Sequence, residues 1–199
     1  MNMEIFTGLI HNTALLLILG FVLELTYHMK EIKYRLNRVF TGVLIGAIGI
    51  GIMLMPFELS NGVFFDTRTI LLGVSGLIFG TVPSVVAAGI LSGYRIFLGG
   101  SGVYMGVATI VTSTLIGLLW KKYLLNKYKK YRNLNIYLFG VVVHLDMILC
   151  AFLLLPSPEN IKFLTEFSLP VILIYPLGTV CLSMLSLRQQ MWQASMLEL

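Results

Sequence analysis

Three charged residues within apolar sequence offer the clearest potential for chemistry. Asp66 and Arg68 lie two residues apart where a polar stretch meets an apolar one, and Arg95 lies near the end of the following apolar sequence. Guanidinium groups match carboxylate and phosphate oxygens, so two arginines here could hold an anionic or polar ligand. The structural alternative is an ion pair, Asp66–Arg95 or Asp66–Arg68, that fixes the local fold. The two interpretations are compatible.

A second polar pair, His144 and Asp146, lies inside a later apolar run. Two residues apart, their side chains point to different faces of a helix, which makes them a poor pair for a shared metal ion. We expect each to hydrogen-bond another helix; a ligand-binding or proton-sensing role is the alternative. Cys150 and Cys181 also lie in apolar runs and are expected to be buried free thiols. No metal-ligand spacing, nucleotide motif or nucleophile–base constellation predicts a cofactor, a metal or an enzyme.

Aromatic and glycine residues complete the candidate set. Tyrosines near the outer half of a membrane usually form an interfacial belt, although they can also line a pocket. The sequence Gly99-Gly100-Ser101-Gly102 is explained as a tight turn, since no Lys-Ser/Thr follows it as in a phosphate-binding loop. The ligand-binding hypothesis comprises Asp66, Arg68, Tyr94, Arg95, Tyr104, His144 and Tyr175. The expected structural motif comprises Gly80, Pro83, Gly99, Gly100 and Gly102.

The amino-acid composition indicates that membrane-spanning helices position these residues. Of 199 residues, 57% are hydrophobic and 12% charged, and the mean hydropathy is +0.89. Soluble domains are about 25% charged and about 45–50% apolar, so the sequence predicts an all-α integral membrane protein, a polytopic helix bundle. The net charge of +5 could suggest nucleic acid. The basic residues instead cluster between apolar segments, as in cytoplasmic loops that also touch anionic lipid, so no nucleic-acid partner is expected. The clusters are Lys30, Lys33, Arg35 and Arg38, then Lys121, Lys122, Lys127, Lys129, Lys130 and Arg132.

The apolar runs predict five full crossings of a membrane, with the N-terminus outside and the C-terminus inside. Glycines 42, 46, 49 and 51 in the second run would let helices approach closely. Phe57–Asp66 and the stretch from Pro156 to Ser168 are predicted outer loops. The crossings are Phe6–Met29, Val39–Pro56, Val103–Trp120, Leu134–Leu155 and Leu169–Leu187.

Between the second and third crossings lies a broken apolar segment, Arg68–Leu98. Its first part, Arg68–Val82, is about 22 Å long as a helix, against a hydrocarbon core of about 30 Å. Pro83 interrupts it, and Ser84–Leu98 is equally short. The segment is either a re-entrant hairpin or two undersized crossings, which would make seven. Broken helices are tolerated in a membrane only where they are buried or line a cavity, and in transporters they often mark a binding site.

The end of the sequence is rich in helix-forming residues and has no stop signal. Residues 188–199 are either a helix end at the membrane interface or the start of a cytoplasmic signalling helix. We therefore divide the chain into a transmembrane domain, residues 1–187, and this helical start, residues 188–199.

Three motifs in fixed order resemble the LytS/YhcK-type five-transmembrane receptor domain. They are Phe65-Asp66-Thr67-Arg68, Gly76-Leu77-Ile78-Phe79-Gly80 and Tyr94-Arg95-Ile96-Phe97-Leu98-Gly99-Gly100-Ser101-Gly102, and the resemblance extends over roughly Phe6 to Leu187. His144 in a later helix also fits. One departure is that Thr81-Val82 stand between Phe-Gly and Pro83, where the family often has Pro directly.

The resemblance implies a multi-pass sensor in a bacterial cell membrane, at the N-terminus of a diguanylate cyclase or a histidine kinase, with that output domain beyond Leu199. It would bind an unknown small ligand or sense the envelope, and we expect a homodimer. The short-helix Gly-Pro pattern is also similar to the substrate-binding membrane components of energy-coupling-factor vitamin transporters. A solute-binding transport component is therefore the alternative function.

Overall fold

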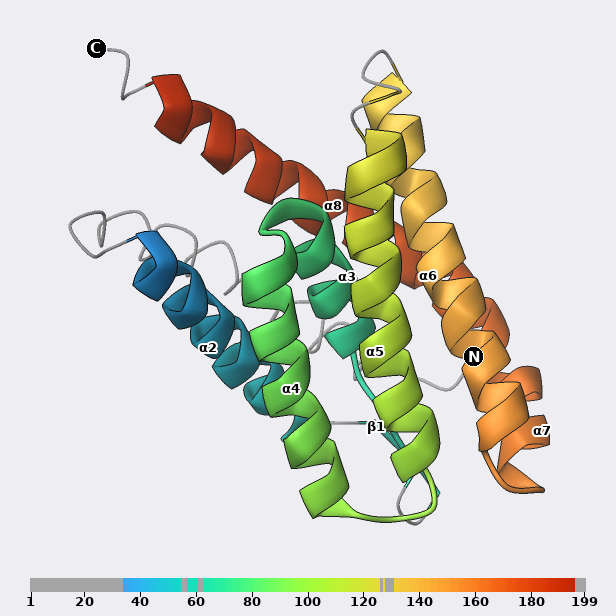
Figure 1. Ribbon diagram of the computed structural model, residues 1–199. Helices are drawn as coiled ribbons and strands as arrows, with labels where there is room; N and C mark the ends of the chain where they lie inside the picture. The colour runs from blue at the N-terminus through green and yellow to red at the C-terminus, as the bar shows by residue number, and fades with distance from the viewer. Residues whose placement is uncertain (1–33, 55–56, 61–62, 126, 128–130, 196–199) are drawn as a thin grey trace.

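The computed structural model describes residues 34–54, 57–60, 63–125, 127 and 131–195 (Figure 1). The predicted crossing Phe6–Met29 lies outside these residues. The helices are α2 (Tyr34–Met53), α3 (Arg68–Ile78), α4 (Thr81–Leu98), α5 (Val103–Trp120), α6 (Arg132–Leu154), α7 (Glu159–Glu166) and α8 (Ser168–Ser195). The π-helix η1 (Lys121–Leu125) prolongs α5, and the strands are β1 (Phe57–Ser60) and β2 (Val63–Phe65).

Helix α3 forms the centre of the bundle. All eleven of its residues are buried, and it contacts α2, α4, α5, α6 and α8. The largest other helix contacts are α2 with α4 and α6 with α8. Figure 1 shows α4 and α5 in front of α3 and α8 behind it. The outer helices therefore enclose a short central helix.

Four helices in the described part are long and apolar enough to cross a membrane: α4, α5, α6 and α8. This confirms the prediction of a polytopic helical membrane protein. Three of the predicted crossings correspond to α5, α6 and α8. The second predicted crossing corresponds to α2, whose apolar part, Arg38–Met53, is shorter. The assignment of inner and outer ends remains a prediction from the basic loops.

The broken segment has a different shape from the predicted one. Its break lies at Gly80, whose φ of +84° is rarely adopted by residues with a side chain. Pro83 lies in the first turn of α4, where its missing N–H costs no helical hydrogen bond. As a result α4 reaches 18 residues and is a candidate span, and α3 alone is undersized.

Polar contacts fix the tip of this α3–α4 hairpin. The hydroxyls of Ser75 and Ser84 share a hydrogen bond of 2.9 Å, and Ser84 Oγ donates to Gly80 O at 2.8 Å. The ammonium of Lys121 donates to Ile78 O at 2.6 Å, at the negative end of the α3 dipole. The hairpin tip therefore lies at the end of the bundle that carries Lys121, which we call the basic end.

Close contacts between helices rely on glycine, as predicted from the glycines of the second crossing. A Cβ added at Gly42, Gly46 or Gly49 of α2 would lie within 3 Å of atoms of α4. Gly51 has open space around it. The tightest contact joins α5 to α3, since a Cβ at Gly117 would lie 2.2 Å from the carbonyl oxygen of Gly73.

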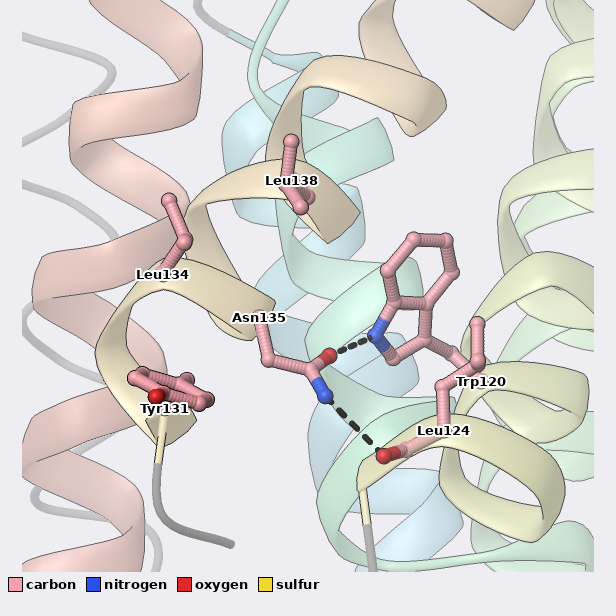
Figure 2. Close-up of a pocket in the computed structure, with 6 residues that line it drawn as sticks. All are labelled: Trp120, Leu124, Tyr131, Leu134, Asn135 and Leu138. Carbon is pink, nitrogen blue, oxygen red and sulfur yellow. Dashed lines mark hydrogen bonds between the residues drawn. The ribbon is translucent and has the colours of Figure 1, made fainter. Parts of the chain in front are cut away.

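The basic end also carries aromatic side chains between α5 and α6. Trp120 Nε1 donates to Asn135 Oδ1 at 2.5 Å, and Asn135 Nδ2 donates to Leu124 O at 2.9 Å (Figure 2). A pocket of about 300 Å³ lies beside this network, with Tyr131 at its edge. Indole and phenol rings are typical of the membrane–water interface, which agrees with a basic loop at this end.

A two-stranded hairpin and a short helix occupy the predicted outer loops. Strands β1 and β2 pair antiparallel within Phe57–Asp66, and α7 forms after Pro158. The turn between α4 and α5 has positive φ at Gly99 (+69°) and Gly100 (+88°), as a glycine turn requires. In Figure 1 this turn and β1 lie at the end opposite the basic end.

Candidate functional site

Asp66 and Arg68 form a buried ion pair at the start of α3. Asp66 Oδ1 accepts a hydrogen bond from the backbone N–H of Arg68 at 2.9 Å and lies 3.4 Å from Arg68 Nε. The exposed fractions of the two residues are 2% and 3%. Of the two pairings predicted from the sequence, the structure shows Asp66–Arg68.

Arg95 brings a second guanidinium group into the interior. It lies in the last turn of α4, is 1% exposed, and donates from Nη1 to Gly99 O at 2.7 Å. Gly106 of α5 provides the space for it, because a Cβ there would lie 2.6 Å from Arg95 Nε. Asp66 and Arg68 both act electrostatically on this guanidinium. Two guanidinium groups and one carboxylate are thus gathered inside the protein.

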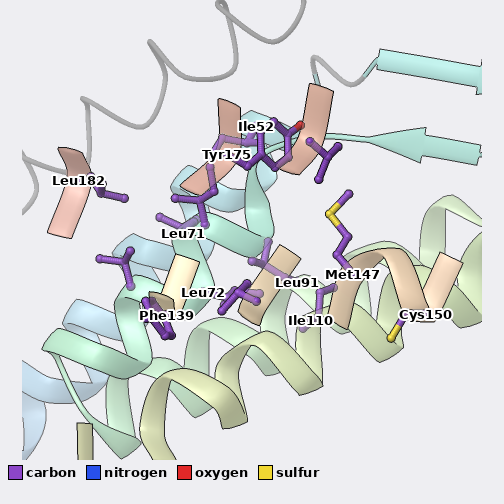
Figure 3. Packing of buried hydrophobic residues seen from close by; sticks show 14 of the residues in the cluster. Ile52, Leu71, Leu72, Leu91, Ile110, Phe139, Met147, Cys150, Tyr175 and Leu182 are labelled. Atoms are coloured by element: carbon purple, nitrogen blue, oxygen red, sulfur yellow. The ribbon is translucent and has the colours of Figure 1, made fainter. Parts of the chain in front are cut away.

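His144 of α6 and Tyr175 of α8 extend this polar region. The two rings meet edge to face, with centroids 5.1 Å apart and planes at 77°. His144 Nδ1 shares a hydrogen bond of 2.6 Å with Gly140 O of its own helix. Tyr175 lies among the buried apolar side chains (Figure 3) and interacts electrostatically with Asp66 and Arg68. We call Asp66, Arg68, Arg95, His144 and Tyr175 the polar cluster.

The polar cluster contains hydrogen-bonding atoms that are not used. Within the described part of the chain, Asp66 Oδ2, Arg68 Nη1 and His144 Nε2 are buried and have no hydrogen-bond partner. Buried polar groups are normally paired, because leaving one unpaired costs about 1–3 kcal/mol. The cluster therefore offers a donor, an acceptor and an imidazole nitrogen to a further polar group.

Two predicted site residues lie outside the polar cluster. Tyr104, in the first turn of α5, is 79% exposed. Tyr94 is half-buried and stacks on Phe97 with a centroid distance of 6.4 Å. Both positions suit the aromatic belt better than a ligand contact. Of the motif residues, Gly99 contacts the cluster through its carbonyl, whereas Gly80 and Pro83 lie at the hairpin tip.

The structural roles expected for His144, Asp146 and the two cysteines are confirmed in part. Asp146 Oδ2 accepts from Thr112 Oγ1 of α5 at 2.5 Å, which confirms a bond to another helix. His144 instead bonds its own helix. Cys150 is buried as predicted, but the prediction for Cys181 was wrong, since it is exposed on α8. The described residues contain no group of three or more His, Cys, Asp or Glu side chains that could hold a metal ion.

Gly106 is a site residue that sequence reasoning missed. It lies directly against Arg95 across the α4–α5 contact. The sequence does contain a signal, because Gly106 lies one helical turn after the Gly99–Gly102 connection. A glycine at that position leaves room for a large side chain against α5. The partner of that small residue follows only from the helix packing.

An apolar bundle of candidate spans around a buried ionisable cluster defines a multi-pass helical membrane protein. The family model 5TM-5TMR_LYT, described as the 5TMR of 5TMR-LYT, matches residues 20–189. The chain therefore belongs to this family of membrane sensor domains and is a multi-pass protein of the cell membrane. The family assigns this region to sensing rather than to catalysis. No curated protein and no solved structure matches the chain significantly.

Proposed function

We propose that this domain senses a small anionic or polar ligand at the polar cluster of a bacterial signal-transduction protein. Occupancy would be passed through α8 to a cytoplasmic diguanylate cyclase or histidine kinase. One observation carries the proposal: Asp66 Oδ2, Arg68 Nη1 and His144 Nε2 are buried without partners in the described residues. A ligand that pairs with these atoms would remove a cost that the empty protein bears.

The composition of the cluster favours a particular ligand chemistry. Arg68 offers a free N–H and Arg95 lies close enough to add its positive charge. An anionic oxygen is the natural partner for such a pair of guanidinium groups. Asp66 Oδ2 can accept from a hydroxyl or amine of the same ligand. We therefore expect a small molecule with an anionic group and at least one hydrogen-bond donor.

Helix α8 supports the proposed relay because it contains a residue of the polar cluster and extends from there to the basic end. Tyr175 lies near its start, and the helix continues to Ser195. Twenty residues of helix correspond to about 30 Å. A ligand can shift α8 only by as much as its affinity differs between the two states of the helix.

The proposal is tested by joining residues 1–199 to a cyclase or kinase output in cells. Arg68→Gln removes the free donor, and His144→Phe keeps a ring against Tyr175 but removes Nε2. Lys162→Gln, on the exposed surface of α7, is the matched control. We expect the first two variants to change basal output or abolish its response, and the control to behave as the parent.

Membrane insertion of each variant is measured alongside output. If Arg68→Gln and His144→Phe insert normally and leave both basal output and response unchanged, the ligand site is not at the polar cluster and the proposal is refuted.

A further inference from the structure

A groove between α6 and α8 lies at the basic end, away from the polar cluster. It has a volume of about 470 Å³ and is lined by Arg132, Val180, Cys181, Met184, Leu185, Leu187 and Arg188. Arg132 begins α6, and Arg188 lies seven residues before the end of α8. The groove thus combines two guanidinium groups with a wall that is largely apolar.

The charges of the two arginines are not balanced by a carboxylate within the described part of the chain. Across the described residues, no carboxylate lies within ion-pair distance of Arg132 or Arg188. Two neighbouring positive charges repel each other, and an anion between them would replace that repulsion with attraction. The N-terminus of α6 adds a further partial positive charge beside Arg132.

The position of the groove specifies the source of the anion. Trp120 and Tyr131 line a separate pocket beside α5 and α6, at the same end of the bundle (Figure 2). Such aromatic residues are typical of the headgroup level of a bilayer. A free phosphate would gain nothing from the apolar wall that α8 provides, whereas a phospholipid would bury an acyl chain there.

We propose that this groove binds an anionic phospholipid, with the phosphate between Arg132 and Arg188. The acyl chain runs along Val180, Met184 and Leu187 toward the bilayer interior. The bound lipid joins the first turn of α6 to the last membrane turns of α8. Its chemistry differs from that of the polar cluster, so the proposal does not depend on the proposed ligand.

Cys181 provides a direct test, because it lines the groove and is exposed. In a Cys150→Ala background it is the only thiol of the chain. Its reaction rate with an uncharged maleimide is measured in neutral detergent micelles that contain phosphatidylglycerol, phosphatidylcholine or inorganic phosphate. We expect phosphatidylglycerol alone to protect Cys181, by at least about fivefold at saturation.

The variants locate the phosphate. Arg132→Gln/Arg188→Gln should raise the phosphatidylglycerol concentration for half-protection about thirtyfold, the effect of two basic groups near a lipid surface. Arg132→Lys/Arg188→Lys, which keeps both charges, should retain most of the protection. Lys122→Gln/Lys127→Gln removes the same charge from η1 and the turn that follows it, and should change the concentration less than about threefold, since screening limits distant charges.

Three results would overturn the proposal. Equal protection by phosphatidylcholine would indicate an apolar groove without charge recognition, and protection by inorganic phosphate would indicate a site for a free anion. A similar loss in the Lys122→Gln/Lys127→Gln control would indicate general attraction to a charged surface. Protection that depends on phosphatidylglycerol and on the charges at 132 and 188 supports it.

Discussion

The contact between α3 and α5 leads to a quantitative prediction for Gly117→Ala. The new Cβ would lie 2.2 Å from Gly73 O and 3.1 Å from Gly76 Cα. Ordinary contact begins near 3.4 Å, so the helices must separate by about 1 Å (3.4 − 2.2 = 1.2). A backbone carbonyl cannot rotate away as the end of a side chain can.

The cost follows from what that separation does to a buried helix. A radial gap of 0.5–1 Å forfeits about a quarter to a half of each dispersion contact across it. Overpacking a core typically costs about 1–3 kcal/mol. Because the obstacle is backbone on a helix with no exposed residue, we expect the upper value, about 3 kcal/mol. For a chain of this size that corresponds to a fall of about 6–12 °C in Tm.

The assay is thermal unfolding of the purified protein in a mild detergent, with Gly89→Ala as the control. Gly89 lies on α4, where no atom of the described residues is within 4 Å of an added Cβ, so its substitution should shift Tm by less than about 2 °C. If Gly117→Ala and Gly89→Ala unfold at the same temperature, the α3–α5 contact is not as close as described and the reasoning fails.

Three further predictions concern polar contacts within the bundle. Asp66→Asn leaves Arg68 charged and buried, and should lower the unfolding free energy by about 3–5 kcal/mol. The double variant Asp66→Asn/Arg68→Gln should recover most of this loss, and no recovery would contradict the ion pair. Lys121→Met removes the donor to the last carbonyls of α3 and should cost about 1.5–3 kcal/mol in the same measurement, whereas an unchanged Tm would show that this bond contributes nothing. A double-mutant cycle of Ser75→Ala and Ser84→Ala should give a coupling of about 0.6 kcal/mol, and additive effects would argue against their hydrogen bond.

The membrane helices could be predicted because their signals are local. The predicted crossing Val103–Trp120 coincides with α5, since a glycine turn precedes it and a basic stretch follows. The break in the hairpin was predicted around Gly80 and Pro83, and the structure places it at Gly80 and not at the proline. In the first turn of a helix proline is tolerated, and the residue that cannot continue α3 is Gly80. Strands β1 and β2 and helix α7 are too short to leave a periodic signal.

The residues of the polar cluster were all among the candidates named from the sequence, but only contacts between neighbours in the chain could be predicted. Asp66 and Arg68 are two residues apart, so their pairing was among the expected possibilities. The contact of His144 with Tyr175 joins α6 to α8, and nothing in the sequence states which faces of those helices meet. For the same reason Tyr104 was grouped with the site, although the packing of α5 leaves it exposed.

The burial of every residue of α3 has a consequence for how the protein is made. A helix of eleven residues gains too little from lipid to insert as an independent segment, and it exposes no surface to lipid once in place. It can be stable only after α5, α6 and α8 have been synthesised and surround it. We therefore expect a late step in biogenesis, in which α3 and α4 enter as one hairpin a bundle that is already in the membrane. Variants that open this centre should be recognised by membrane proteases before they reach a folded state.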